Sequence, residues 1–291
     1  MGNSNERSTA AEEDAKMMVG PEIPEVPPMS KRLFLVRHGE VINPGGDRPV
    51  YYGAQDVSLS PLGQEEAKAA ARYLAQFDLD CVVASPLSRA VYGAEQVLQL
   101  QSNDNLWLKI KEGLKELDRG VWCGKTFDEI GREAMNKFDA CDESVTPDGG
   151  ESFPALKERV LKARDETLEE LSAGKAAAIV SHLQVTRCML SEAKGIPTSG
   201  MAKLKIATAS VTCIDYDMVT GTQTVHFESF KPGKCGVEFV WCNIIFLDES
   251  KWNFVNYVKL FIARLAPPLT WTLQISGCKP PKMLLIRSFI V

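Results

Sequence analysis

The chain has 291 residues, of which 45% are hydrophobic and 24% are charged, and its formal net charge is −5. This length and apolar content suffice for one large α/β domain or two ordinary domains with a full core. The acidic balance argues against a nucleic-acid-binding protein, which usually presents a basic face, but it does not exclude a local phosphate site.

Cysteine and histidine usage narrows the class of protein further. Eight cysteines are scattered along the chain without a close CxxC pair, and there are three histidines. This pattern predicts reduced thiols in a cytoplasmic protein, and not a disulfide framework or a zinc site. We expect no metal and no other cofactor.

The two ends of the chain differ in character from the middle. Residues 1–30 are acidic and Pro-rich and have no periodic apolar face, which predicts a disordered leader. Residues 233–291 hold three of the five tryptophans, and charges and Pro267-Pro268 interrupt their apolar runs. These runs are shorter than the roughly 20 residues that span a bilayer, so we expect no stable membrane insertion. We interpret 233–291 as an atypical extension without a fold of its own; a partner-binding or membrane-surface segment is the alternative.

The middle part, predicted as one domain over residues 31–232, alternates strand and helix patterns. Leu33 to Val36 are four apolar residues in a row, which is typical of a buried strand. Ser60 and Pro61 are the N-cap and first residue of a helix. The further predicted strands are 81–84, 107–111, 176–180, 210–216 and 222–227, and the further predicted helices are about 86–100, 152–171 and one from residue 184. The pattern predicts a three-layer α/β/α fold with a mainly parallel sheet and helices on both faces.

Basic side chains follow three of the predicted strands. Arg37 and His38 end the first strand, Arg89 lies one helical turn after the second, and His182 follows the strand at 176–180. Carboxyl ends of neighbouring parallel strands meet at one edge of a sheet, where ligands bind. Two arginines and two histidines suit a phosphate monoester, because guanidinium donors match phosphate oxygens. A neutral imidazole is a good nucleophile, and Glu116 is a suitable carboxylic acid for the leaving group.

Several motifs, in the correct order over roughly residues 31–230, resemble the histidine phosphatase superfamily, also called phosphoglycerate mutase-like. Arg37-His38-Gly39 matches the signature triplet of that family, and Ser181-His182 lies where its second catalytic histidine is found. The other matching segments are Asn43-Pro44, 85–90, Leu114-Lys115-Glu116 with Gly120 and Gly124, and Gly150-Glu151-Ser152. One departure is Leu183, because the family commonly has Ser-His-Gly there, and glycine eases a tight turn.

The resemblance implies a role for each site residue. His38 is the phosphorylated nucleophile, Glu116 is the proton donor, and His182 binds the transferring phosphoryl group. Arg37, Arg89 and Asn43 are implied to bind phosphate. Alternatives stay open: Asp118 or Glu112 as the acid, and Asn43 as a turn residue only.

The reaction expected from this resemblance is metal-independent hydrolysis of a small phosphorylated metabolite through a phosphohistidine. Phosphoglycerate mutases of the family carry a long insertion with paired arginines, whereas residues 117–150 lack such a pair. Mutase-type phosphoryl transfer and a non-catalytic binding or scaffold role are the alternatives. Specificity is expected to depend on loops 44–56 and 119–150, with Arg48, Tyr51, Tyr52 and Arg119 as possible substrate contacts.

Overall fold

The computed structural model describes residues 20–103, 106–233, 239–244 and 258–263. The chain divides into two compact units, Met1–Lys234 and Cys235–Val291, and each is described by itself. In the second unit, β7 (Phe239–Ile244) pairs antiparallel with β8 (Val258–Ala263).

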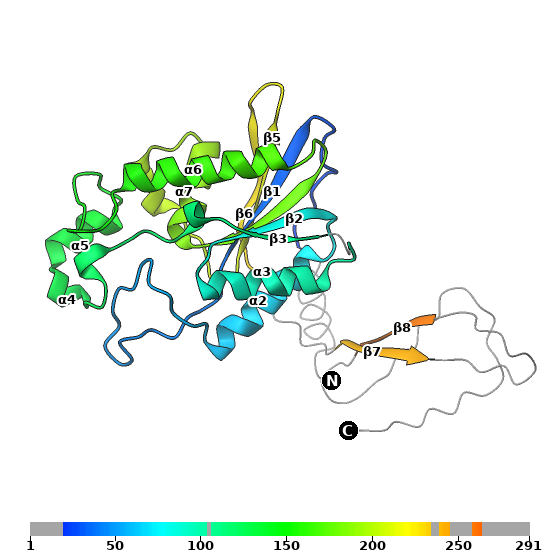
Figure 1. The fold of residues 1–291 in the computed structure, drawn as a ribbon, viewed down its shortest axis with the longest axis horizontal. Helices are drawn as coiled ribbons and strands as arrows, with labels where there is room; N and C mark the ends of the chain where they lie inside the picture. The colour runs from blue at the N-terminus through cyan, green and yellow to red at the C-terminus, as the bar shows by residue number, and fades with distance from the viewer. Residues whose placement is uncertain (1–19, 104–105, 234–238, 245–257, 264–291) are drawn as a thin grey trace, which may run out of the picture. The chain divides into compact units, whose positions relative to one another are not determined.

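A six-stranded sheet forms the centre of the first unit (Figure 1), with the order β3-β2-β4-β1-β5-β6. β1, β2, β3 and β4 are parallel, and β5 is antiparallel to both of its neighbours. All six predicted strands are present, and the prediction of a mainly parallel sheet is confirmed. The strands are β1 Ser30–Arg37, β2 Leu79–Ala84, β3 Leu108–Ile110, β4 Ala176–Ser181, β5 Val211–Asp217 and β6 Gln223–Phe230.

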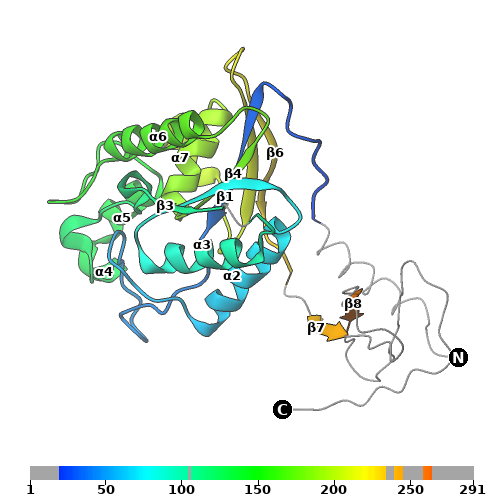
Figure 2. The same cartoon turned by 45° about the vertical axis from the view of Figure 1, so that its right-hand side comes forward.

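Helices cover both faces of this sheet, which gives the predicted three layers. α2 and α3 lie on one face, and α6 and α7 lie on the other (Figures 1 and 2). The helices are α2 Pro61–Leu74, α3 Ser88–Leu100, α4 Phe127–Ile130, α5 Arg132–Asp139, α6 Phe153–Glu170 and α7 Leu183–Ala193, with 3₁₀ turns at Glu112–Leu114, Gly120–Trp122 and Thr198–Lys203. None of the helices in the described part of the chain is both long and apolar enough to cross a membrane.

The helix starts follow from local sequence. The Ser60 hydroxyl accepts a hydrogen bond from the Gly63 N–H at 3.0 Å, so Ser60 caps α2 as predicted. Ser152 caps α6 in the same way, through the Ala155 N–H. The short helices α4 and α5 fall within the segment that was predicted as a loop.

Alternation along β1 fills the core on both sides of the sheet. Leu33 and Leu35 pack with α6 and α7, whereas Phe34 and Val36 pack with α2 and α3. All four side chains are at most 4% exposed, as expected for a central strand.

Part of the predicted leader contacts this core. Residues 20–29 are described, and Ile23 and Val26 pack against the cluster that includes Phe34. The Pro24 carbonyl accepts a hydrogen bond from Arg32 at 2.8 Å. Residues 1–19, the rest of that prediction, lie outside the described residues, as does most of 233–291.

Candidate functional site

The two predicted site histidines meet at the carboxyl edge of the sheet. β1 and β4 pair in parallel with Arg37 opposite Ser181, so His38 and His182 each follow at the same level. The His38 N–H donates to the Ser181 carbonyl at 2.9 Å, and the two imidazole ring centroids are 5.1 Å apart. The register of two neighbouring strands therefore brings together residues that are far apart in sequence.

The geometry of His38 fixes which of its ring nitrogens carries the proton. Nδ1 is 2.7 Å from the carbonyl oxygen of Gly39, and a carbonyl can only accept. Nδ1 therefore carries the hydrogen, and Nε2 keeps its lone pair. Burial, with the charges of Arg89 and Arg37, lowers the pKa of His38 to about 3, so the ring is neutral at neutral pH.

Gly39 allows the backbone after His38 to pass close to Gly63. A Cβ atom at position 39 would lie 2.1 Å from the carbonyl oxygen of Gly63, at the start of α2. Backbone meets backbone there, so no larger residue fits without a shift of the chain. This contact explains the glycine in the Arg37-His38-Gly39 triplet.

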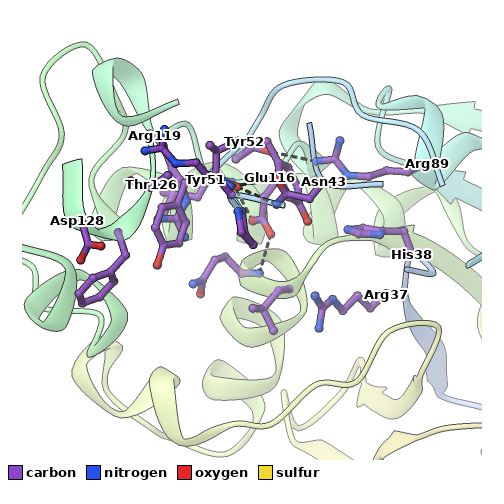
Figure 3. Close-up of a pocket in the computed structure, with 18 residues that line it drawn as sticks. Arg37, His38, Asn43, Tyr51, Tyr52, Arg89, Glu116, Arg119, Thr126 and Asp128 are labelled. Carbon is purple, nitrogen blue, oxygen red and sulfur yellow. Dashed lines mark hydrogen bonds between the residues drawn. The ribbon is translucent and has the colours of Figure 1, made fainter. Parts of the chain in front are cut away.

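Arg37 and Arg89 both line a pocket of about 630 Å³ together with His38 (Figure 3). The Arg37 Nη1 donates to the Ile206 carbonyl at 2.6 Å. Arg89 is 1% exposed, donates to the carbonyls of Gln55 (2.7 Å) and Gly53 (2.9 Å), and lies over the Tyr52 ring. These bonds orient both guanidinium groups.

Each of these cations also keeps a buried donor atom without a hydrogen-bond partner among the described residues. The unpartnered atoms are Nε of Arg37 and Nε of Arg89, and Nδ1 of His182 is a third. Buried donors are rarely left unsatisfied in proteins, because the cost is about 1–3 kcal/mol each. Three such nitrogens around a neutral imidazole suit an anion with several oxygens.

His182 is fully buried beside His38 and is held by a residue whose role the sequence did not reveal. Its Nε2 lies 2.7 Å from the hydroxyl of Ser85, which follows β2. The Ser85 Oγ also accepts from the Leu87 N–H at 3.3 Å and has one proton that it can donate to Nε2. In the tautomer in which Nε2 accepts that proton, Nδ1 carries the ring hydrogen and is a donor. Burial and the nearby charges lower the pKa of His182 well below its usual value.

Glu116 lines the same pocket and is held at two oxygens. Its Oε1 accepts from the Leu117 N–H at 2.8 Å, and its Oε2 accepts from the Gln184 N–H, in the first turn of α7, at 3.4 Å. The two other candidate acids, Asp118 and Glu112, line a neighbouring hollow of about 460 Å³ instead. Gln184 is a pocket residue that the sequence analysis missed, because it lacks a charge and a motif.

Asn43 lines the pocket, but its amide is largely engaged by its own loop. The Oδ1 accepts from the N–H groups of Gly45 (2.9 Å) and Val50 (3.0 Å), and Nδ2 donates to the Val50 carbonyl at 3.0 Å. This is the geometry of the turn residue that was considered as the alternative. One amide hydrogen is left for a phosphate oxygen.

Leu183, the departure from Ser-His-Gly, is compatible with the local backbone. His182 is extended, with φ of −129°, and Leu183 is the first residue of α7. A helical residue does not need the conformational freedom of glycine. The Leu183 side chain lines the pocket and packs against the core cluster on the α6 and α7 side of the sheet.

The loops predicted to set specificity supply the other end of the pocket. Residues 48–53 come from the first loop, and Arg119 and 126–128 come from the second. Figure 3 shows Arg119 and Tyr51 toward one end, His38 and Arg89 toward the other, and Glu116 between them. Within the part of the chain that the structure describes, no three His, Cys, Asp or Glu side chains gather in a way that could hold a metal ion.

Comparison with known proteins agrees with this fold. The family model of the histidine phosphatase superfamily (branch 1) matches residues 33–227, which is most of the first unit. The chain belongs to the histidine phosphatase superfamily. The match begins within β1 and ends within β6, so it includes residues of all six strands of the sheet.

Relatives within the superfamily include both phosphatases and mutases. Phosphoserine phosphatase 1 of Hydrogenobacter thermophilus is 31% identical over 172 residues, 58% of this chain and 78% of its own length. A 2,3-bisphosphoglycerate-dependent phosphoglycerate mutase of Cytophaga hutchinsonii is 27% identical over 199 residues, 67% of this chain and 92% of its own length. The solved structure of Bacillus stearothermophilus YhfR is 28% identical, with a TM-score of 0.62, over 68% of this chain and 96% of that protein.

Other relatives in the superfamily are longer proteins. Mycobacterial proteins that are 29% identical over 219 residues match 72% of this chain, and the chain spans 58% of their length. Members of the superfamily act on small phosphorylated substrates, and the relatives named above include both phosphatases and mutases.

Proposed function

We propose that this histidine phosphatase superfamily member is a metal-independent phosphomonoester hydrolase that acts through a phosphohistidine on a small phosphorylated metabolite. One observation carries the proposal: His38 is a neutral imidazole with a free Nε2, and three buried nitrogens near it, on Arg37, Arg89 and His182, have no hydrogen-bond partner within the described part of the chain. A nucleophile and an oxyanion site in one pocket are what phosphoryl transfer requires.

The first step is in-line attack of Nε2 of His38 on phosphorus. The N–P bond forms as the ester P–O bond breaks, and Glu116 gives a proton to the leaving oxygen. Arg37, Arg89 and the Nδ1–H of His182 donate to the equatorial oxygens, where negative charge is held in the transition state. Asn43 contributes its remaining amide hydrogen.

The second step returns the enzyme to its starting state. Glu116, now a carboxylate, takes a proton from a water molecule that attacks phosphorus. The N–P bond breaks, its electron pair returns to Nε2, and inorganic phosphate leaves. The carbonyl of Gly39 keeps Nδ1 protonated in both steps. Nε2 therefore serves as the nucleophile in the first step and as the leaving group in the second.

Hydrolysis is favoured over mutase-type transfer by the few cations at the far end of the pocket. A mutase has to hold a second phosphate while the first resides on histidine. In residues 117–150 the arginines are Arg119, which lines the pocket, and Arg132, which is exposed and does not. Arg119 and Arg48, which is 75% exposed and paired with Glu129, offer limited compensation for a second phosphate dianion.

We also propose that the protein is cytoplasmic, as its cysteine usage predicts. Cys81, Cys123, Cys141, Cys188 and Cys213 are free thiols. Free thiols are typical of reducing compartments.

Hydrolysis of para-nitrophenyl phosphate in EDTA, by the wild type and by His38→Ala, tests the proposal. We expect metal-independent turnover that disappears in the variant, and acid-labile labelling of wild-type protein by a ³²P donor. Equal turnover by His38→Ala would overturn the assignment. Transfer of label to a second monophosphate faster than phosphate release would favour a mutase, and neither label nor turnover would favour a binding role.

A further inference from the structure

Arg119 is a pocket cation that the proposed reaction does not use. Its guanidinium carbon lies 4.4 Å from the Tyr51 ring centroid and 4.7 Å from that of Phe138. Nη1 is buried and has no hydrogen-bond partner among the described residues. The two aromatic contacts hold the planar group by its faces, which leaves the donors at its edges for a ligand.

The loop that orients Arg89 also fixes the place of Arg119. Gly53 has a φ of +46°, and a Cβ there would lie 2.6 Å from the Leu117 carbonyl and 3.0 Å from Cγ of Arg119. Only glycine lets the loop approach 117–119 this closely. Because the Gly53 carbonyl also accepts from Arg89, one short segment sets the positions of both arginines.

No ion pair among the residues that the structure describes neutralises the charge of Arg119. Burial lowers the pKa of its guanidinium, while Glu116, Asp139 and Tyr51 raise it. Among the described residues, neither carboxylate lies within ion-pair distance of it. Arg119 is half-buried, and a partly desolvated charge without a partner is costly, so an arriving anion would reduce that cost.

We infer that Arg119 is a specificity-determining residue that binds a carboxylate of the substrate, at the opposite end of the pocket from the phosphoryl group. This inference rests on the proposed function, because it takes the phosphoryl group to lie at His38. A carboxylate suits the site better than a second phosphate does, because one guanidinium balances the single negative charge of a carboxylate but only part of a phosphate dianion. Arg48, the other cation at that end, is 75% exposed and paired with Glu129.

Binding of two matched ligands tests the inference. 3-Phosphoglycerate and glycerol 3-phosphate differ by a carboxylate against a hydroxymethyl group, and calorimetry with full-length His38→Ala gives their affinities without turnover. A charge-assisted pair predicts about 10- to 150-fold tighter binding of 3-phosphoglycerate. Equal affinity for the two ligands would overturn the inference, and no binding of either would overturn the proposed phosphate site as well.

Further variants of the His38→Ala protein distinguish recognition of the carboxylate by Arg119 from a general effect of positive charge. Arg119→Gln is expected to lose most of the preference for the carboxylate, and Arg119→Lys to keep part of it. Arg132→Gln removes the same charge from an exposed position on α5 and is expected to keep the full preference. If Arg119→Gln folds poorly, the Arg119→Lys ratio decides, and an unchanged ratio in either folded variant contradicts the inference.

Turnover measured separately keeps the two hypotheses apart. Wild-type protein that prefers 3-phosphoglycerate in binding, but releases no phosphate from any monoester, would support the inference and contradict the hydrolase. Wild-type protein that hydrolyses para-nitrophenyl phosphate but binds both matched ligands equally would support the hydrolase and contradict the inference.

Discussion

His38 and His182 lie with ring centroids 5.1 Å apart at the ends of neighbouring parallel strands, and both are buried. Two protonated imidazoles at this distance, beside Arg37 and Arg89, would repel each other. The pKa of each is accordingly lowered by burial first and by the nearby positive charges second. The arrangement keeps both rings neutral, with a free lone pair on Nε2 of His38 and, among the described residues, no hydrogen-bond partner for Nδ1 of His182.

The depressed pKa of His38 predicts a pH dependence of stability. In the unfolded chain the residue takes up a proton as pH falls through about 6.5, whereas in the folded protein it does so only near pH 3. The unfolded state therefore binds more protons between these values, and stability falls as pH falls. At pH 5.5 the loss is about 1.4 kcal/mol for this one group relative to pH 7.5.

Denaturant unfolding of the wild type and of His38→Gln at pH 7.5 and 5.5 measures this loss. The variant lacks the proton uptake, so its free energy of unfolding should fall by about 1.4 kcal/mol less than that of the wild type over the same interval. Titrating groups away from position 38 contribute alike to both proteins, and the pKa of His182 is lowered first by its own burial, which the variant keeps. An identical pH dependence of the two proteins would show that His38 takes up its proton over the same pH range in the folded and the unfolded state.

Arg89 is expected to be intolerant even of lysine. Its two Nη atoms hold the carbonyls of Gln55 and Gly53, and its Nε is left for the substrate. Lysine keeps the charge but lacks the planar fork. We expect Arg89→Lys to lower kcat/KM for para-nitrophenyl phosphate by about 100-fold or more, as for the loss of an oxyanion donor. Arg132→Lys, exposed on α5, is the control, and a less than threefold effect of Arg89→Lys would contradict the assigned role.

The sequence was most informative where a local pattern determines the structure. The apolar run at Leu33 to Val36 and the Ser60-Pro61 start of α2 require only neighbouring residues to be interpreted, and both are confirmed. The parallel sheet followed from the alternation of strands and helices. His38, Arg37, Arg89 and Glu116 line one pocket, as expected from their places after the strands.

The parts that the sequence did not reveal depend on contacts between distant segments. Ser85 meets His182 only because β2 and β4 are neighbours in the sheet. The stacking of Arg119 between Tyr51 and Phe138 joins two loops and a helix. α4 and α5 were missed because both are short and lack a long periodic apolar face. The contacts of the Asn43 amide with its own loop could not be predicted either, because the sequence shows only that turn residues follow it.

The buried ion pair between Arg32 and Asp215 links β1 to β5 and lies outside the candidate site. The carboxylate accepts from Nε at 2.6 Å and from Nη2 at 2.7 Å, and both side chains are under 8% exposed. Asp215→Asn would leave a buried guanidinium without its charge partner, which costs about 3–5 kcal/mol of stability. Denaturant unfolding measures this loss, and Glu133→Gln, which breaks an exposed pair with Lys137, should give no measurable change. A comparable, small effect of both variants would show that the buried pair is not required.

The loss of rate in a Glu116 variant is predicted to be larger for a substrate with a poorer leaving group. para-Nitrophenolate leaves readily without a proton, whereas an alkoxide does not. If Glu116 is the general acid, Glu116→Gln should slow hydrolysis of an alkyl phosphomonoester such as glycerol 3-phosphate by about 100- to 10,000-fold. The first chemical step with para-nitrophenyl phosphate, followed as the burst of nitrophenolate, should slow far less, because only the later hydrolysis of the phosphohistidine then needs the carboxylate.

Asp118→Asn is the matched control. This carboxylate lies two residues from Glu116 and lines the neighbouring hollow, not the pocket of His38. The sequence also offers it as an alternative general acid. The Asp118→Asn variant should leave the ratio of the two rates unchanged. If Asp118→Asn shows the dependence on the leaving group and Glu116→Gln does not, the acid is Asp118, and the hydrogen bonds of Glu116 to Leu117 and Gln184 serve only to hold the loop against α7.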